Sequence, residues 1–309
     1  MPVWGLMLSI MTAAMWAVSP MLIKEGLRGA RAWDVNPIKS IGFIFTMLIA
    51  MLLLQPGKWP TVTPVLVMGV FLNVIISNVL GDQCQIYSIK KIGVSLAVSI
   101  GCGYPLITTV FSILMLGEKI TILIWIGTIL IILGLLVIKS DTTSKKSTNR
   151  EYDVNYMKSR EEKLKGLMFA LAAAILWGVN MPYLKVLMTA AGWSGTEAYF
   201  LRSIALFLMS WGIRAVQYKK FRHSIRALDK IPRKSLRALL VSGVFGLGVG
   251  GILFATCIEV LPVSVVTPIT ASSPLITVIL SRIFLRERLS NLQCVGIALV
   301  VAGSVSVSL

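Results

Sequence analysis

Two short segments in apolar stretches of this sequence each combine a tryptophan, a small polar residue and a proline. These residues are Trp16, Ser19 and Pro20 in WAVSPMLIK, and Trp177, Asn180, Pro182 and Tyr183 in WGVNMPYLK. Proline removes an amide donor and crowds the preceding turn, so we expect each helix to loosen there. Loosened carbonyl groups, together with indole, hydroxyl and amide groups, would form a binding site for a small solute.

Glycine and proline predict a second pair of interrupted helices further along the chain. The residues are Ser99, Gly101, Gly103, Tyr104 and Pro105 in one stretch, and Pro268, Thr270, Ser272 and Pro274 in TPITASSP in the other. Helices broken at corresponding places expose backbone groups to a cavity in carriers built from repeats. Two alternatives stay open: the prolines only kink helices for packing, or the two tryptophans anchor the chain at the membrane surface.

Arg202 is the one clear charge inside an apolar stretch. Arg202 and Lys39 could both attract a carboxylate or phosphate of a substrate, or both could extend to nearby lipid head groups. Lys39, at the corresponding place earlier in the chain, is expected near the opposite surface. Asn73 and Asn78 are costly in lipid, so they should face protein or a cavity. Every carboxylate is predicted to lie in a loop or at a span end, and Asp82 is among the nearest to the membrane.

Composition predicts an all-α membrane protein. Of 309 residues, 56% are hydrophobic and 14% are charged, and the mean hydropathy is +0.83. One soluble core cannot enclose so much apolar surface. The charges are bunched between apolar runs of roughly 20 residues, the length of a membrane-spanning helix. We predict ten transmembrane helices, at about 3–23, 37–55, 64–82, 93–116, 120–138, 164–184, 196–216, 236–258, 263–284 and 290–309.

The last predicted hairpin occurs twice in the sequence. Residues 105–134 and 274–303 both begin with Pro-Leu-Ile-Thr, share a glutamate and end in paired glycines, and 11 of the 30 aligned residues are identical. The glycines lie on one helix face, where another helix can approach closely. The chain therefore divides into repeats at 1–139 and 164–309, joined by a polar linker at 140–163. Because five spans are an odd number, the second repeat is upside down, which predicts a 5+5 inverted-topology repeat.

Basic residues are distributed unevenly between the predicted loops. The net charge is +17; the loops on one side carry 26 Lys or Arg, and those on the other side carry three. The positive-inside rule then predicts a multi-pass cell-membrane protein with both termini outside and the 140–163 linker in the cytoplasm. Nucleic-acid binding is excluded, because no basic domain with stacking aromatics accompanies the charge.

The duplicated hairpin, with its PLIT, glutamate and glycine positions, resembles the EamA domain of the drug/metabolite transporter superfamily. The resemblance covers nearly the whole chain. It implies a secondary carrier, mostly found as an exporter of small metabolites such as amino acids, which works by alternating access through a central cavity between the two repeats. Well-known ten-span members look as though they keep both termini in the cytoplasm, whereas the charge distribution here predicts the reverse.

Other functional classes leave little trace in the sequence. HExxH, GxSxG and Walker A patterns are missing, and the four cysteines lack the spacing of a metal site, so no enzyme activity, cofactor or metal is predicted. The expected partners are a small-molecule substrate and the lipid bilayer, and the sequence does not indicate an oligomeric state. The alternative is a non-transporting regulatory or scaffold protein that binds anionic lipid or partners through its polybasic loops.

Overall fold

The computed structural model describes residues 3–146, 160–220, 231–276 and 291–308. Within these ranges every regular element is helical. Helices suit a chain in lipid, because hydrocarbon offers no partner to an unpaired backbone N–H or C=O. Residues 277–290 of the predicted hairpin 274–303 lie outside the described part of the chain, and so does the side chain of Ser99.

The first half of the chain contains one helical run with an internal change of geometry and one that is broken. Its elements are α1 (Val3–Gly26), α2 (Ala32–Leu54), the continuous run of α3 (Pro64–Val74), η1 (Ile75–Asp82) and α4 (Gln83–Ile92), the broken pair α5 (Val94–Gly101) and α6 (Tyr104–Leu116), and α7 (Ile122–Lys146). The prediction ended this span at residue 82, but the run that begins at α3 continues to Ile92. Asp82 therefore lies well inside a helix.

The helices described in the second half follow the same order as those of the first. They are α8 (Arg160–Ala191), α9 (Gly195–Lys220), the continuous run of α10 (Arg233–Ser242), η3 (Gly243–Val249) and α11 (Gly250–Val260), α12 (Val263–Ala271), and α14 (Asn291–Ser308). In both halves the third helical run changes to π-helical geometry near its middle. The sequence pattern did not predict these π-helical segments.

Six helical runs among the described residues are long and apolar enough to cross a membrane, and four further apolar helices are shorter. The long runs are 3–26, 32–54, 64–92, 161–191, 195–217 and 233–260, and the short ones are 104–116, 122–134, 263–276 and 295–307. These runs confirm an all-helical membrane protein. The short helices coincide with the predicted fourth, fifth, ninth and tenth spans, and ten complete spans stay a prediction.

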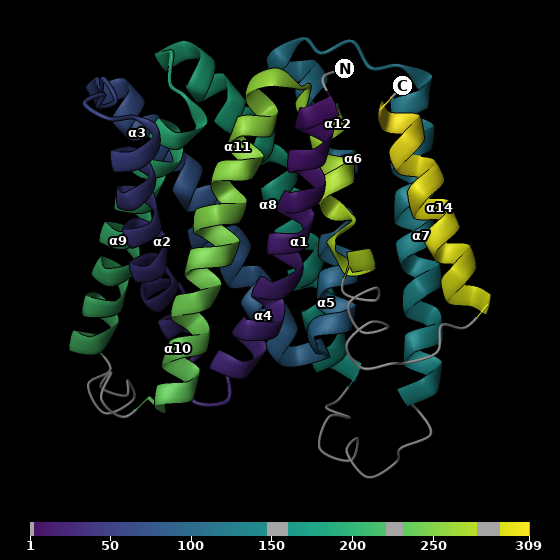
Figure 1. The fold of residues 1–309 in the computed structure, drawn as a ribbon. Coiled ribbons are helices and arrows are strands. Elements are labelled where there is room, and N and C mark those ends of the chain that lie inside the picture. The colour runs from purple at the N-terminus through teal and green to yellow at the C-terminus, as the bar shows by residue number, and fades with distance from the viewer. Residues whose placement is uncertain (1–2, 147–159, 221–230, 277–290, 309) are drawn as a thin grey trace.

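The two halves of the bundle interlock (Figure 1). α1 packs on α10 and α11 of the second half, and α8 packs on η1 and α4 of the first half. α2 lies against α9, so the second helices of the two halves also meet. The first and last helices bring the N- and C-terminal ends to the same end of the bundle. Because each half packs on the other in the same way, the centre of the bundle is shared between them.

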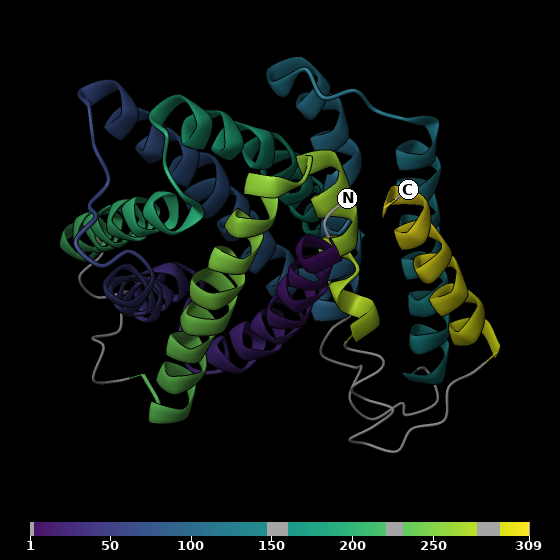
Figure 2. The same ribbon diagram turned by 45° about the horizontal axis from the view of Figure 1, so that its top comes forward.

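α7 and α14 form a tight pair at one edge of the bundle (Figure 2). Glycines make this approach possible, as their spacing predicts. A Cβ atom on Gly127 would lie 2.5 Å from the carbonyl oxygen of Gly303, and one on Gly134 would lie 2.6 Å from that of Gly296. The two backbones therefore touch where larger side chains would hold them apart.

The glycines of η3 allow the first half to pack directly on its backbone. A Cβ atom on Gly243 would collide with the carbonyl oxygen of Lys39, and one on Gly248 would lie 2.7 Å from Thr46. Gly243 faces backbone, which cannot move aside as a flexible side chain can. The glycine-rich segment thus packs closely against the first half.

We predict that Gly243→Ala destabilises the protein by about 1–3 kcal/mol, the usual effect of overpacking a tight contact. Gly212→Ala is the matched control, because a Cβ atom at Gly212, also in a helix, meets nothing within 4 Å. The control should be neutral or stabilising, since alanine is the better helix former. Thermal unfolding of the purified protein in detergent measures both. Equal melting temperatures for the two variants would contradict the close contact.

Candidate functional site

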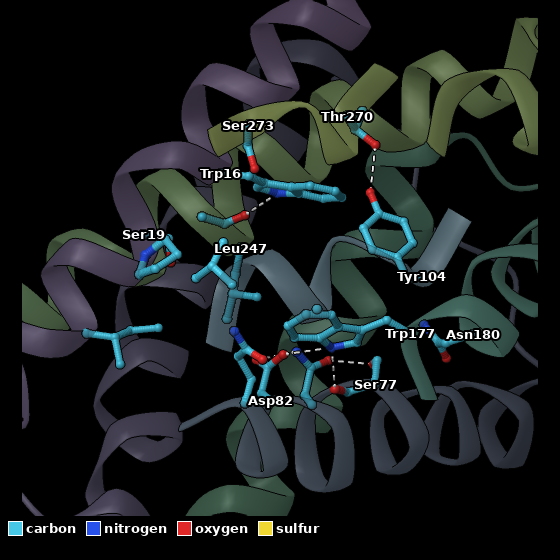
Figure 3. A pocket seen from close by; sticks show the side chains of 18 of the residues that line it. Trp16, Ser19, Ser77, Asp82, Tyr104, Trp177, Asn180, Leu247, Thr270 and Ser273 are labelled. Atoms are coloured by element: carbon cyan, nitrogen blue, oxygen red, sulfur yellow. Dashed lines mark hydrogen bonds between the residues drawn. The ribbon is translucent and has the colours of Figure 1, made fainter. Parts of the chain in front are cut away.

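A cavity of about 180 Å³ lies between the two halves of the bundle (Figure 3). Its lining residues come from α1, α2, η1 and α4 to α6 of the first half and from α8, α9, η3, α11 and α12 of the second. The volume is several times the ~30 Å³ that one water molecule occupies in the liquid. The cavity is therefore suited to a small organic molecule.

Trp16 and Trp177 make equivalent contacts across the cavity. The indole Nε1 of Trp16 donates to the carbonyl of Gly246 in η3 at 3.0 Å, and that of Trp177 donates to the carbonyl of Ser77 in η1 at 3.2 Å. Ser77 and Gly246 are 169 positions apart, the offset that relates the two hairpins. Each tryptophan thus satisfies a carbonyl in a π-helical segment of the other half.

A glycine makes room for each indole ring. Built Cβ atoms on Gly81 and Gly250, again 169 positions apart, would each lie 2.9 Å from the nearer indole nitrogen, on Trp177 and Trp16 respectively. The tryptophans are therefore fitted into the π-helical segments and do not reach for the membrane surface. This placement rejects the interfacial alternative for both residues.

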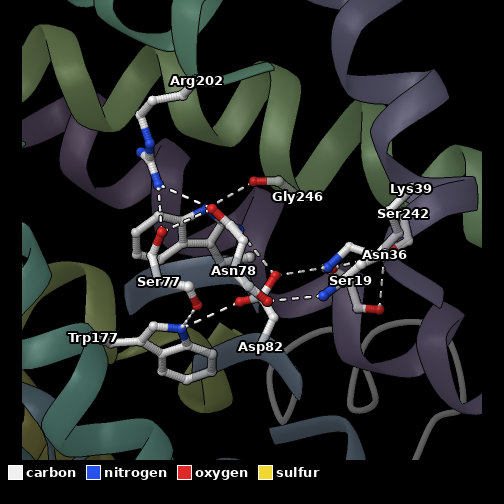
Figure 4. A network of polar contacts seen from close by, with 11 residues as sticks. Ser19, Asn36, Lys39, Ser77, Asn78, Asp82, Trp177, Arg202, Ser242 and Gly246 are labelled. Atoms are coloured by element: carbon white, nitrogen blue, oxygen red, sulfur yellow. Dashed lines mark hydrogen bonds and ion pairs between the residues drawn. The ribbon is translucent and has the colours of Figure 1, made fainter. Parts of the chain in front are cut away.

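A chain of polar contacts crosses one wall of the cavity (Figure 4). Asp82 accepts hydrogen bonds from Lys39 Nζ at 3.3 Å, from Asn78 Nδ2 at 3.1 Å and from Trp177 Nε1 at 3.2 Å. The Nη2 group of Arg202 donates to Ser77 Oγ at 3.1 Å and to Asn78 Oδ1 at 3.3 Å. Asn78 therefore connects the buried ion pair to the buried guanidinium.

Three expectations about charged residues are corrected by this network. Lys39 is buried in α2 instead of lying near a surface, because Asp82 compensates its charge. Asp82 lies inside a helical run and not at its end, because η1 continues into α4. Arg202 does not extend to lipid head groups: it is 6% exposed, and its guanidinium lies 4.5 Å from the centre of the Tyr199 ring.

The two interrupted helices, α5–α6 and α12, are joined by hydrogen bonds of Tyr104. α5 ends at Gly101 and α6 begins at Tyr104, while α12 ends at Ala271 and helix resumes after Ser272. The Tyr104 hydroxyl lies 2.9 Å from Thr270 Oγ1 and donates to the carbonyl of Thr267 at 3.2 Å. The residue that follows the break between α5 and α6 is therefore hydrogen-bonded to the helix that leads into the second break.

The prolines occupy two kinds of position in the helices. Pro105 lies in the first turn of α6, where its missing amide is harmless. Pro20, Pro182 and Pro268 lie inside α1, α8 and α12, and these helices continue past them. The expected loosening at Pro20 and Pro182 thus does not interrupt the helix, because neighbouring helices can satisfy the few freed backbone groups.

The structure places most, but not all, of the predicted binding residues at the cavity. Those that line it are Trp16, Ser19, Asn78, Tyr104, Trp177, Asn180, Arg202 and Thr270, together with Pro20 and Gly101. Asn73 and Ser272 are buried elsewhere, and Tyr183 donates to the carbonyl of Gly69. The neighbouring Ser273 lines the cavity instead of Ser272.

Sequence reasoning did not place several of the lining residues in the cavity, chiefly Lys39, Ser77, Asp82 and Gln85. Lys39 and Asp82 were assigned to span ends because a charge usually marks the end of an apolar run. A signal was present nonetheless, since Lys39 aligns with Arg202, and two buried cations require an acid nearby. Within the described residues, His, Cys, Asp and Glu form no group of three that could hold a metal ion.

The hairpin glutamate of the first half has a structural partner outside the cavity. Glu118 accepts hydrogen bonds from the amides of Val263 and Ser264 and from the Ser264 hydroxyl, at 2.7, 3.1 and 2.6 Å. These amides open α12, where the first N–H groups of a helix have no internal partner. Glu118 therefore caps a helix of the second half and joins the two halves.

The fold and the cavity define a polytopic helical membrane protein with a solute-sized cavity between two similar halves. The chain belongs to the EamA-like transporter family, whose pattern matches residues 3–140 and again 164–309. The two matches fall on the two halves that share the hairpin. Proteins of this family are membrane transporters and not enzymes.

Two individual proteins are similar to this chain over nearly its whole length. The chain is 23% identical to an uncharacterized transporter of Archaeoglobus fulgidus over 300 residues, which cover 96% of this chain and 95% of the relative. A solved crystal structure of a protein matches 99% of this chain and 98% of its own, with a TM-score of 0.73 and 15% sequence identity. The latter likeness shows that the fold is shared.

We predict that Asp82→Asn destabilises the protein by about 3–5 kcal/mol, because it leaves Lys39 as an uncompensated buried charge. The double variant Lys39→Met/Asp82→Asn should recover much of that loss, since both charges are then removed. Lys165→Met tests an exposed ion pair with Glu161 and should change stability by at most about 1 kcal/mol. Thermal unfolding compares the variants. Additive effects of the two single substitutions would contradict the buried pair.

Proposed function

We propose that this protein is a secondary transporter that exports small organic metabolites, such as amino acids, by alternating access through the central cavity. The observation that supports this most directly is the cavity itself. It is walled by both halves, and its two aligned tryptophans, Trp16 and Trp177, are each held by a π-helical segment of the opposite half. Because both halves form the site, a movement of either half changes its shape.

Alternating access requires two arrangements of the bundle with similar free energies. An inverted repeat of ten spans supplies them, because exchanging the conformations of the two halves turns the cavity from one membrane face to the other. The equivalent contacts at Ser77 and Gly246 favour such an organisation. The interrupted helices near Gly103 and Ser272 are where the backbone can absorb the change.

The direction of transport and the substrate rest on other grounds. Export and small metabolites follow from the resemblance to the EamA family, and a cavity of about 180 Å³ suits solutes of this size. The linker at 140–163 is proposed to be cytoplasmic because of the basic loops. Both termini would then be outside, and both lie at the same end of the bundle.

We expect the purified protein in proteoliposomes to exchange radiolabelled solutes, measured with a panel of amino acids, sugars and nucleosides. Trp16→Ala and Trp177→Ala should lower the rate for the transported solute about tenfold or more, equivalent to roughly 1.4 kcal/mol, because each removes a wall of the cavity. Trp4→Ala is the matched control, since Trp4 is an exposed tryptophan of the same helix as Trp16.

Folding of each variant is checked by size-exclusion chromatography. Unchanged transport in both Trp16→Ala and Trp177→Ala would contradict the assignment of the cavity as the solute pathway. If no solute of the panel moves through correctly folded wild-type protein, a transporter of small metabolites is excluded, and the regulatory alternative through the polybasic loops gains support.

We also expect a single cysteine introduced by Ser147→Cys, in an otherwise cysteine-free variant, to be protected from an impermeant thiol reagent in intact cells. Breaking the membrane should then expose it, because the basic linker is held in the cytoplasm. The same reagent should label Lys58→Cys in intact cells, since Lys58 lies in a loop on the opposite side. Labelling of the linker cysteine in intact cells would reverse the proposed orientation.

A further inference from the structure

Three ion pairs join the two halves at one end of the bundle. At this end, the basic end, α1, α4 and α9 end and α2, α8 and α10 begin, so it lies opposite the terminal end, which carries both termini (Figure 1). Each pair connects a helix of the first half to a helix of the second half. The pairs are Glu25 with Lys234 at 3.0 Å, Asp34 with Arg214 at 2.9 Å, and Lys91 with Glu162. All six helices are therefore tied across the halves at the basic end.

An apolar layer separates these ion pairs from the cavity. Ile23, Ile86 and Ile89 line the cavity and are buried in a cluster that also includes side chains of α2 and α10. Glu25 and Lys91 follow Ile23 and Ile89 by two positions, and α1 and α4 both run toward the basic end. The ion pairs thus lie beyond an apolar floor, and a solute that passes through the basic end must displace both layers.

The repeat assigns each residue of these ion pairs a counterpart near the terminal end. The first helices of the two halves correspond at an offset of 161 positions, the second helices at 163 and the third runs at 169, as shown by the aligned residues Trp16 and Trp177, Lys39 and Arg202, and Ser77 and Gly246. The counterpart pairs are Val186 with Val65, Glu197 with Met51, and Met1 with Val260. None of these three pairs combines opposite charges.

The halves are joined at the terminal end by other kinds of contact. The indole Nε1 of Trp193 donates to the carbonyl of Thr61 at 2.9 Å, and Glu118 accepts from the neutral amides that open α12. Aromatic rings of the two halves are in contact at both ends, namely Trp59 and Phe200 at the terminal end and Tyr87 and Phe169 at the basic end. Ion pairs between the halves therefore distinguish the basic end from the terminal end among the described residues.

This difference bears on the balance between the two states of an inverted-repeat carrier. When the halves exchange conformations, one end of the cavity opens and the other closes. Apolar and aromatic contacts that are lost at one end are then replaced by similar contacts at the other. The three ion pairs are lost without replacement, because the counterpart positions lack opposite charges. The charges thus favour the state that is closed at the basic end.

We propose that these three ion pairs form a latch, which keeps the basic end closed and sets the balance between the two states of the transport cycle. This proposal rests on the proposed transport function and names the contacts that regulate access to its cavity. In the orientation that the basic loops favour, the latch lies at the cytoplasmic face.

The exposure of the latch is compatible with repeated opening. The side chains of Lys91 and Glu162 are 21% and 29% exposed, and such partly hydrated pairs contribute little stability each. Asp34 and Arg214 are only 3% and 12% exposed, so salt screens their attraction least. Several modest attractions hold the end closed together, and none of them is strong enough to prevent its opening.

The latch is tested by pulsed electron paramagnetic resonance on the full-length protein in nanodiscs. Spin labels are attached through Lys90→Cys and Arg237→Cys in an otherwise cysteine-free variant. Both side chains are exposed, and they lie at the basic end on helices of different halves, outside the latch. The distance between the labels reports opening of this end without any added substrate.

Lys91→Glu/Lys234→Glu places like charges at two of the three crossings. We expect it to raise the fraction of long distances about fivefold or more, since two attractions become repulsions. Adding Glu25→Lys and Glu162→Lys restores opposite charges at both crossings, and the distances should return to those of the parent protein. A residue that acts only through its shape would not be rescued in this way.

The matched control changes the same number of charges near the same end. Lys163→Glu/Lys165→Glu alters two exposed residues of α8, and the ion pair of Lys165 is with Glu161 in the same helix. The control should leave the distances between the labels unchanged. If Lys91→Glu/Lys234→Glu is poorly folded, Lys91→Gln/Lys234→Gln takes its place and should raise the long-distance fraction about threefold, because attraction is lost without added repulsion.

Three outcomes overturn the latch. These are unchanged distances in the folded latch variant, an equal change in the control, and a folded charge-restored variant that stays open. Transport is scored separately by the proteoliposome exchange. Solute exchange with unchanged distances in the latch variants would keep the transporter and reject the latch, whereas opening that follows the charges without any exchange would reject only the transport function.

Discussion

A carbonyl group that is freed inside a membrane-embedded helix must find a donor, because the bilayer core supplies none. In this protein the indoles of Trp16 and Trp177 supply such donors, each to a carbonyl in the π-helical segment of the opposite half. These hydrogen bonds therefore also join the halves and hold two aromatic side chains in the wall of the cavity.

The buried charges follow from the same low-dielectric surroundings. Lys39 and Arg202 can lie at the centre of the bundle only because acceptors on η1 surround them, with Asp82 taking one cation and Ser77 and Asn78 taking part of the other. The segment η1, whose Ser77 carbonyl accepts the hydrogen bond from Trp177, thus also carries the groups that stabilise the cations. Moving η1 would disturb the tryptophan, the ion pair and the guanidinium together.

Sequence reasoning found the helical membrane class, the duplication and many of the lining residues, because apolar runs and aligned polar residues can be recognised in the sequence itself. It placed Trp16, Asn180 and Arg202 in a common site, and the structure brings them to one cavity. It missed the π-helical segments, since one extra residue per turn leaves no distinct pattern of side chains. It ended the third span at Asp82, because a lone charge is costly inside the membrane. The structure removes that cost by pairing Asp82 with Lys39, which lies 43 positions away and which no local pattern indicates as its partner.

The two halves correspond closely in backbone, yet they differ at the residue that carries the acid. Asp82 in the first half aligns with Gly251 in the second, at the same offset of 169 that pairs Ser77 with Gly246. An assembly of two identical half-length chains contains every charged residue twice. The net charge of the side chains that line a cavity on its symmetry axis is therefore always even. An odd sum requires halves that have diverged, and fusion into one polypeptide lets each position change alone. Lys39, Arg202 and Asp82 give the lining of this cavity a net charge of +1, which a symmetric dimer of such halves could never have possessed.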